Sequence, residues 1–286
     1  MSIVRKIPIL LEMIKFKLTV FAMPFAFTGA FLAARGLPEW SVIIWVICAM
    51  VGARTSAMGF NRIVDWKFDA ANPRTDKRAI PAGEVRLKEA WGMVILAALL
   101  FFVSCWQLNR LTLLLSPLAL ALTFFYSFTK RFTSLCHLVL GVALALAPLG
   151  GWVAVTGTLL DYPFALSLGV LFWVAGFDTI YGCLDADFDR TAGLHSLPSR
   201  LGRRNAFRLA GLFHVLAFAL FAITGMQMQL NFVYFIGLAV TAGALCYQHI
   251  IVSPTDLSRI KASFFSMNGL ISLTIFCATW LALATA

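Results

Sequence analysis

Oxygen-bearing side chains recur every three or four residues in two polar segments of the sequence. The first segment contributes Asn61, Asp65 and Asp69, and the second contributes Asp178, Tyr181, Asp185 and Asp189. On a helix, residues four apart lie on one face, so we expect each segment to form one stripe of oxygens. Carboxylates one turn apart repel each other, and such a stripe therefore typically binds a cation. Carboxylate and amide oxygens are ligands that suit Mg²⁺. Phosphate oxygens of a substrate then complete the coordination of the ion.

The two segments match at an offset of 120 residues. Asp65-x-x-Phe68-Asp69 aligns with Asp185-x-x-Phe188-Asp189, and Asn61 aligns with Tyr181. Duplication of a four-helix unit predicts this match, because an even number of spans returns the second copy to the same side of a membrane. The copies would then face each other across a shared cavity and bind a diphosphate through bridging Mg²⁺ ions.

Basic residues accompany both segments and are suited to phosphate oxygens, as bidentate guanidinium or point-charge contacts. They are Arg74, Lys77, Arg78, Lys130, Arg131, Arg190 and Arg200. A single acidic stripe at a helix end is equally well explained as a solvated face. The repetition at one offset, with Arg and Pro following each copy, favours a metal and diphosphate site.

The elements that position these residues must lie in a membrane. The chain has 286 residues, of which 60% are hydrophobic and 13% charged, with a mean hydropathy of +0.86, whereas soluble domains are about 25% charged. This excludes a soluble, disordered, collagenous or disulfide-rich secreted protein. The six cysteines are scattered singly and indicate neither bridges nor a metal site. The net charge of +10 is better explained by membrane orientation than by nucleic acid.

Apolar runs of membrane-spanning length predict an all-α, polytopic protein with about nine transmembrane helices in one bundle. The expected spans are 16–34, 40–61, 88–108, 111–129, 134–157, 162–183, 205–226, 230–252 and 263–284. We expect one domain over 1–286, without a linker. No small-residue cleavage site follows the first run, which we interpret as a permanent helix rather than a signal peptide.

The basic residues predict the orientation. With the N-terminus in the cytoplasm, 20 of the 23 Lys and Arg residues fall on that side, while Arg35 and Arg110 lie outside and Arg54 lies within a span. We therefore expect a multi-pass protein of the cell inner membrane. Both acidic segments face the cytoplasm in this topology, and the C-terminus lies on the opposite side.

Two other functions share some of these features. A secondary transporter also has duplicated halves and intramembrane charge, but its site usually lies near the midplane rather than at the membrane margin. A phosphatidyl transferase of the CDP-alcohol type also uses an Asp-x-x-x-Asp pair. Its Asp-Gly-x-x-Ala-Arg sequence is absent before the first pair here.

Over essentially its whole length the sequence resembles the UbiA superfamily of intramembrane aromatic prenyltransferases. The motifs that carry the resemblance are Asn61-x-x-x-Asp65-x-x-x-Asp69, Arg74-x-x-x-Arg78-Ala-Ile-Pro81-x-Gly83, Tyr126-x-x-x-Lys130-Arg131 and Asp178-x-x-Tyr181-x-x-x-Asp185-x-x-x-Asp189. Residues 193–202 and 265–269 look most like the 4-hydroxybenzoate polyprenyltransferase branch, which is close to the naphthoate prenyltransferases of menaquinone synthesis. Leu184 departs from the polar residue that related sequences often have there.

The resemblance implies a nine-helix bundle with a lateral opening to lipid. The implied reaction is Mg²⁺-dependent transfer of a polyprenyl group from its diphosphate to a ring carbon of an aromatic hydroxy acid, in ubiquinone or menaquinone biosynthesis. The implied partners are these two substrates and membrane lipid. Neither a nucleic acid nor an obligate protein partner is implied.

For this reaction we assign roles to the candidate residues. Asp65, Asp69, Asp185 and Asp189 would bind Mg²⁺, with Asn61 as a supporting ligand; Arg74, Arg78, Lys130, Arg131 and Arg200 would bind the diphosphate or the acceptor carboxylate. Tyr126 and Tyr181 would face the carbocation, and Arg54 would bind the acceptor. Asp178 or Asp187 would act as the base, although Asp187 is as well explained by pairing with an Arg. For His195 we favour a structural role.

Overall fold

The computed structural model describes residues 3–15 and 17–286, and within these ranges the chain is helical with no strand. The expectation of an all-α protein is confirmed. The helices are α1 (Ile3–Met13), α2 (Lys17–Ala34), α3 (Trp40–Val64), α4 (Trp66–Ala71), α5 (Leu87–Leu108), α6 (Arg110–Thr129), α7 (Cys136–Thr156), α8 (Phe164–Gly182), α9 (Ala186–Thr191), α10 (Leu197–Gln227), α11 (Phe232–Ile251), α12 (Ile260–Ala262) and α13 (Asn268–Ala284), with a π-helical turn, Ser263–Met267, between the last two.

Eight of the described helices are long and apolar enough to cross a membrane. They correspond to the second to ninth expected spans, and the last of them runs through α12, the π-turn and α13. The first expected span corresponds to α2, of which Met23–Ala34 is a shorter apolar helix; its expected start, residue 16, lies outside the described residues. The seventh span begins earlier than expected because Ser196 caps a first helical turn before a bend at Gly202, where φ is +76°.

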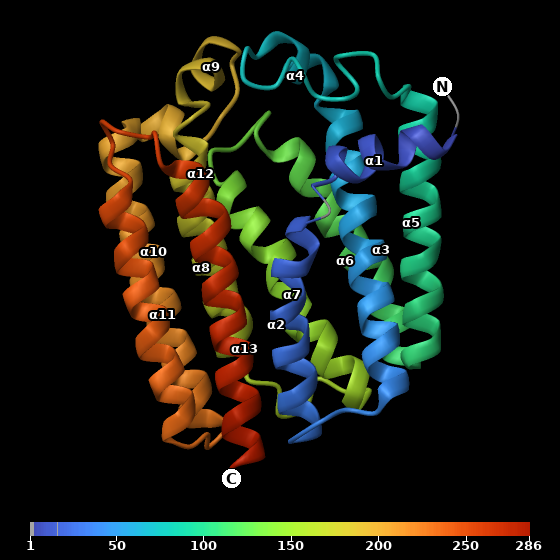
Figure 1. Cartoon of the computed structure of the whole chain (residues 1–286), viewed down its shortest axis with the longest axis vertical. Coiled ribbons are helices and arrows are strands. Elements are labelled where there is room, and N and C mark those ends of the chain that lie inside the picture. The colour runs from blue at the N-terminus through green and yellow to red at the C-terminus, as the bar shows by residue number, and fades with distance from the viewer. Residues whose placement is uncertain (1–2, 16) are drawn as a thin grey trace.

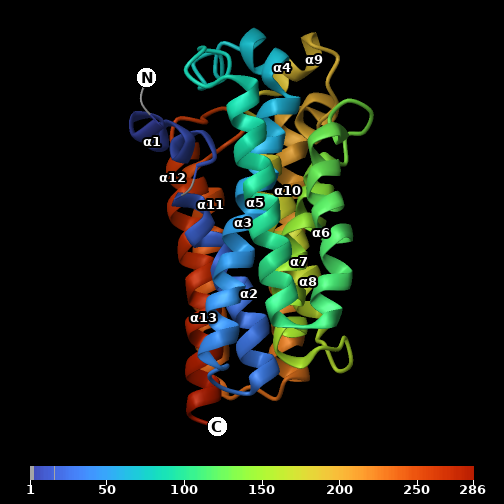
Figure 2. The ribbon, with the colours of Figure 1, turned by 90° about the vertical axis from the view of Figure 1, so that its right-hand side faces the viewer.

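The helices follow each other in two similar sets, α2 to α6 and α7 to α11, in agreement with an internal duplication. Within the sets α3 packs against α5 and α8 packs against α10, and α2 packs against α7 between the sets. The short helices α4 and α9 keep the 120-residue offset at both ends. They lie next to each other across one end of the bundle, with α1 at the same end and the C-terminus at the other (Figure 1). The side view in Figure 2 also shows α1, α4 and α9 toward one end of the bundle and the C-terminus at the other.

The seam between the two sets depends on glycine. A Cβ atom added to Gly151 of α7 would lie 1.9 Å from the Ala26 carbonyl oxygen of α2, and one added to Gly29 would lie 2.0 Å from the Pro148 carbonyl oxygen. Small residues allow such close approach of helix backbones in membranes, where packing rather than water exclusion drives association. These two glycines therefore determine how closely the two halves approach each other.

Candidate active site

The two aspartate motifs lie where a long helix bends into a short one. The prediction of one unbroken helical stripe is wrong in this respect, because α3 ends before Asp65 and α4 begins after it. Asp65 has φ −94° and ψ 4°, and Asp185, between α8 and α9, has φ −103° and ψ 1°. The Asp69 amide still donates to the Asp65 carbonyl oxygen at 2.8 Å, so helical hydrogen bonding continues across the bend. The bend directs Asp69 into the end of the bundle, where it is buried.

Asp185 joins the two loops. Arg74, from the first loop, donates from Nε to Asp185 Oδ1 at 2.7 Å and from Nη2 to Oδ2 at 2.5 Å. Asn72 Nδ2 donates to the same Oδ1 at 3.0 Å. Burial alone would raise the pKa of the Asp185 carboxyl, but the bonds and charge of Arg74 outweigh it and lower that pKa below its usual value. The structure thus brings together residues more than a hundred positions apart.

Asp69 has one oxygen paired and one open. Arg78 Nη1 donates to Oδ1 at 2.6 Å, while the guanidinium of Arg62 stands 3.8 Å from Oδ2. Among the residues that the structure describes, buried Oδ2 has no hydrogen-bond partner. Its ion pair with Arg62 is long and supplies no hydrogen bond, so the oxygen keeps the capacity to bind a ligand.

The remaining two aspartates lie beside the turn that follows α6. Lys130 Nζ donates to Asp189 Oδ2 at 3.2 Å; burial disfavours the charged ammonium, but the Asp189 carboxylate outweighs this and raises the Lys130 pKa. Asp65 accepts from Asn61 Nδ2 at 2.9 Å and pairs with Arg131 at 3.4 Å. Burial, and next the charge of Asp69, raise the pKa of the Asp65 carboxyl despite Arg131.

The donor set fits Mg²⁺, which selects carboxylate and amide oxygens. In the part of the chain described here, no three acidic, His or Cys side chains already form a group able to hold a metal ion. Each of the four carboxylates pairs with a basic side chain instead. The Asp69 oxygen that has no hydrogen-bond partner is available to coordinate such an ion, and Mg²⁺ sites of this kind are commonly completed by phosphate oxygens of a substrate.

Arg54 lies on α3 seven residues before Asn61, hence on the same helix face. Its Nε is buried and has no hydrogen-bond partner among the described residues. A cation at this depth normally has an anionic partner. On α8, the Tyr181 ring lies 5.7 Å from the guanidinium carbon of Arg74. Tyr126 is in the last turn of α6, one turn before Lys130.

Three residues that shape the site were not among the candidates predicted from the sequence. His137, buried at the start of α7, lies with Nδ1 2.7 Å from Asp178 Oδ2. Asn72 donates a hydrogen bond to Asp185. Arg62 lies 3.8 Å from Asp69. The signal for His137 was a polar residue in the first turn of an otherwise apolar span, whereas Asn72 and Arg62 were visible only as parts of a polar loop.

Arg200 lies apart from the aspartates and makes no ion pair with any acidic residue described. Its Nη1 donates to Ser134 Oγ at 3.5 Å, and it lines a hollow of about 650 Å³ together with Arg190 and His195. Exposed Asp187 pairs with Arg203 at 2.8 Å and with Arg190 at 3.4 Å, so of its two interpretations the pairing is observed.

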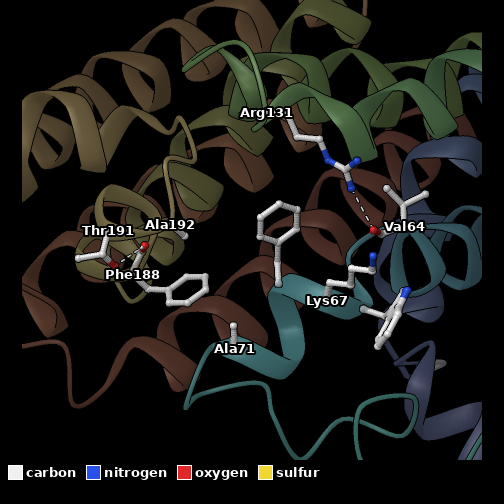
Figure 3. A pocket seen from close by; sticks show the side chains of 9 residues that line it. Val64, Lys67, Ala71, Arg131, Phe188, Thr191 and Ala192 are labelled. Atoms are coloured by element: carbon white, nitrogen blue, oxygen red, sulfur yellow. Dashed lines mark hydrogen bonds between the residues drawn. The ribbon is translucent and has the colours of Figure 1, made fainter.

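A second hollow, of about 750 Å³, opens between α4 and α9. Figure 3 shows Lys67 of α4, Phe188 of α9 and Arg131 around this space. Trp66 and Phe68 also line it. Arg131 links the hollow to the aspartates through its ion pair with Asp65.

Known proteins are similar to this chain in sequence and in fold. The family model described as the UbiA prenyltransferase family matches residues 22–270. A 4-hydroxybenzoate octaprenyltransferase of Tolumonas auensis is 32% identical, over 88% of this chain and 87% of that protein. The apo structure of a UbiA homolog from Aeropyrum pernix K1 matches with a TM-score of 0.85 and 36% identity, over 92% of this chain and 96% of that one. A UbiA homolog from Archaeoglobus fulgidus bound to GPP and Mg²⁺ shares the fold, with a TM-score of 0.66 and 18% identity over 95% and 99% of the two chains.

Proposed function

The chain belongs to the UbiA prenyltransferase family, and from this we propose that it transfers a polyprenyl group from a polyprenyl diphosphate to a ring carbon of 4-hydroxybenzoate in quinone biosynthesis. Membership of this family argues against the two alternatives, a secondary transporter and a phosphatidyl transferase. The names of the relatives favour the hydroxybenzoate over a dihydroxynaphthoate as acceptor. The observation that carries the proposal is the bidentate Arg74–Asp185 pair, which joins the two aspartate loops into one site.

In the proposed reaction the diphosphate lies among the aspartates and their basic partners. Asp65, Asp69, Asp185 and Asp189 hold Mg²⁺, with Asn61 in support. When bound, the metal neutralises the diphosphate and stabilises the charge that develops on it as the allylic C–O bond breaks. Arg74, Arg78, Lys130 and Arg131 exchange their carboxylate partners for phosphate oxygens, whose geometry suits a guanidinium fork. Arg200 donates to Ser134 and makes no ion pair with a described aspartate, so in this proposal it contacts the diphosphate only at the margin of the site.

The acceptor lies deeper in the bundle. The unpaired Arg54 binds its carboxylate, and the rings of Tyr126 and Tyr181 face the carbocation. A new bond forms between the allylic carbon and the ring as diphosphate leaves. The displaced ring proton passes to the Asp178 carboxylate, which His137 holds in place at 2.7 Å.

We place the site and the N-terminus at the cytoplasmic surface of the inner membrane, with the C-terminus on the opposite side. The support is the asymmetry of basic residues together with the gathering of α1, α4 and α9 at one end of the bundle (Figure 1). A multi-pass protein in this position meets its lipid-borne donor from the bilayer and its water-soluble acceptor from the cytoplasm.

The test is a transfer assay on membranes that contain the chain, with radiolabelled octaprenyl diphosphate and Mg²⁺. 4-Hydroxybenzoate and a dihydroxynaphthoate are supplied in separate reactions. We expect prenylated hydroxybenzoate, and its loss in Asp65→Ala and Asp185→Ala. Transfer at the wild-type rate by either variant would show the metal assignment to be wrong. Transfer to the dihydroxynaphthoate alone would show that the naphthoate, and not 4-hydroxybenzoate, is the acceptor. Mass spectrometry of the quinone made in a host that depends on this chain reports the ring and tail together.

A further inference from the structure

The hollow between α4 and α9 lies at the meeting point of the two sequence copies. Phe68 and Phe188, which both line it, are the equivalent positions of the repeated Asp-x-x-Phe-Asp motif. Residues of α4 and α9 form its walls, and Arg131, which also lines it, pairs with Asp65 of the first motif at 3.4 Å. A solute held in the hollow therefore lies beside a residue that contacts the candidate site.

The lining combines flat apolar faces with positive charge. Trp66, Phe68 and Phe188 supply rings, Lys67 and Arg131 supply the cations, and none of the nine described lining residues is acidic. The Arg131 guanidinium carbon lies 5.4 Å from the centre of the Phe68 ring, within the range of a cation–π contact. Lys67 Nζ lies 5.7 Å from the Trp66 ring and forms no ion pair with a described acidic side chain. An unpaired ammonium beside aromatic walls suits a small anion that has an aromatic ring.

We propose that this hollow is an entry site that binds the aromatic carboxylate acceptor before it passes inward. The ring lies between Phe68 and Phe188, and the carboxylate is held by Lys67, while Arg131 remains with Asp65 and the diphosphate. The inference deepens the proposed function and rests on it, because the ligand is the acceptor of that reaction. Arg131 then connects the entry site to the chemistry, since it lines the hollow and pairs with Asp65.

The other hollow has a different chemistry. It is lined by Arg190, Arg200 and His195 together with hydroxyl-bearing side chains, and Phe132 is the one Phe or Trp side chain among its described lining residues, whereas Trp66, Phe68 and Phe188 line the hollow between α4 and α9. Its two guanidinium groups and several hydroxyls suit phosphate oxygens better than an aromatic ring. The contrast between the two linings favours the acceptor for the hollow between α4 and α9, and not the diphosphate.

The test is steady-state kinetics of the purified full chain in detergent, with the variants Lys67→Gln and Phe188→Leu. Loss of a charge-assisted contact predicts an acceptor KM about tenfold higher for Lys67→Gln. We expect kcat and the KM for polyprenyl diphosphate to stay within about twofold, because neither side chain touches the aspartates. Lys88→Gln removes an exposed cation of α5 that does not line the hollow and serves as the matched control, with no change expected.

Benzoate and cyclohexanecarboxylate separate ring recognition from charge. Benzoate is expected to compete with the acceptor more strongly than cyclohexanecarboxylate in the wild type, and Phe188→Leu to remove most of that difference. An unchanged acceptor KM in both variants, or an increase in the donor KM instead, would overturn the entry site while leaving the proposed function intact. If the wild type transfers a prenyl group to no aromatic acid, the proposed function fails. Calorimetric titration of benzoate into wild type and Lys67→Gln then tests the hollow directly, and equal affinities would refute it.

Discussion

The aspartate loop after α3 and the one after α8 have the same backbone and different partners. Both bend at an aspartate and continue into a six-residue helix. Asp69 pairs with Arg78 of its own loop, and Asp65 with Arg131 of the turn after α6. Asp185 is held by Arg74 and Asn72 of the other loop, and Asp189 by Lys130. The first loop therefore supplies side chains to the second, and no described contact runs the other way.

The difference follows from what comes after the short helices. The chain needs residues 72–86 to reach α5, whereas residues 192–196 suffice to reach α10. The longer connection has room for Asn72, Arg74 and Arg78, all of which bind a carboxylate. A duplicated scaffold thus gives two similar sets of acidic ligands, and the length of one connection turns them into a single asymmetric site. The opposite pKa shifts of Asp65 and Asp185 record this asymmetry.

The largest expected effect comes from Asp185→Asn. The change removes a charged metal ligand and leaves the Arg74 guanidinium without its bidentate partner. We expect kcat to fall by about 10²–10³-fold, as for the loss of one electrostatic group in other active sites. Asp65→Asn is expected to reduce kcat by a similar factor but to lower thermal stability less, because its ion pair with Arg131 is longer, at 3.4 Å. The prenylation assay and thermal denaturation in detergent measure the two effects.

The matched control for both variants is Asp187→Asn. Asp187 has the same side chain, lies in the same short helix as Asp189, and pairs only with exposed arginines among its described contacts. Its activity is expected within about twofold of the wild type, as for most surface substitutions. Equal thermal destabilisation by Asp65→Asn and Asp185→Asn would contradict the asymmetry.

The next effect in size is that of Arg74→Lys against Arg78→Lys. Arg74 makes two bonds to one carboxylate across the two loops, and lysine cannot reproduce that fork. Arg78 makes one hydrogen bond to Asp69, within its own loop. We expect kcat/KM for the donor to fall about tenfold in Arg74→Lys and about threefold in Arg78→Lys. The reverse order would show that the link between the loops matters less than the contacts within one loop.

Much of this fold was predictable from the sequence. Runs of apolar residues determined the spans to within a few positions, because a helix must be apolar over the thickness of the bilayer. The repeated motif at an offset of 120 predicted that α4 and α9 are equivalent. The start of α10 was misplaced because its first turn is polar and is separated from the apolar run by the bend at Gly202.

The pairing of side chains was not predictable. The motifs named Asp185 and Arg74 as members of one site, but which guanidinium meets which carboxylate depends on how residues 72–86 fold back over the bundle end. Arg200 was grouped with the phosphate ligands because of its position after the second motif. Its contact with Ser134 depends instead on the turn after α6, which spacing in the sequence does not locate.

A smaller effect concerns pH. The Asp65 pKa is raised and the Asp185 pKa is lowered, so on acidification Asp65 takes up a proton first. A protonated carboxyl is a poor metal ligand, and activity is therefore expected to fall on the acid side with the titration of Asp65 while Asp185 stays ionised. Arg131 lowers the Asp65 pKa in the free protein, so Arg131→Gln should move the acid limb of kcat/KM for the donor to higher pH. Profiles of kcat/KM against pH for the two enzymes, each normalised to its maximum, check this. An acid limb at the same pH in both would assign the titration to another group.

The smallest expected effect on catalysis comes from the seam that holds the two loops in register. Gly151→Ala places a Cβ where the Ala26 carbonyl oxygen is 1.9 Å away, and because that atom is backbone, α2 and α7 must separate. Overpacking of this kind costs roughly 1–3 kcal/mol of unfolding free energy. Gly150→Ala is the matched control, since a Cβ at Gly150 meets no atom within 4 Å. We expect a lower melting temperature in detergent for Gly151→Ala alone, with kcat per folded molecule reduced by about twofold to fivefold. A variant with an unchanged kcat would show that the aspartate loops keep their register through Arg74 and Asp185 rather than through the helices beneath them.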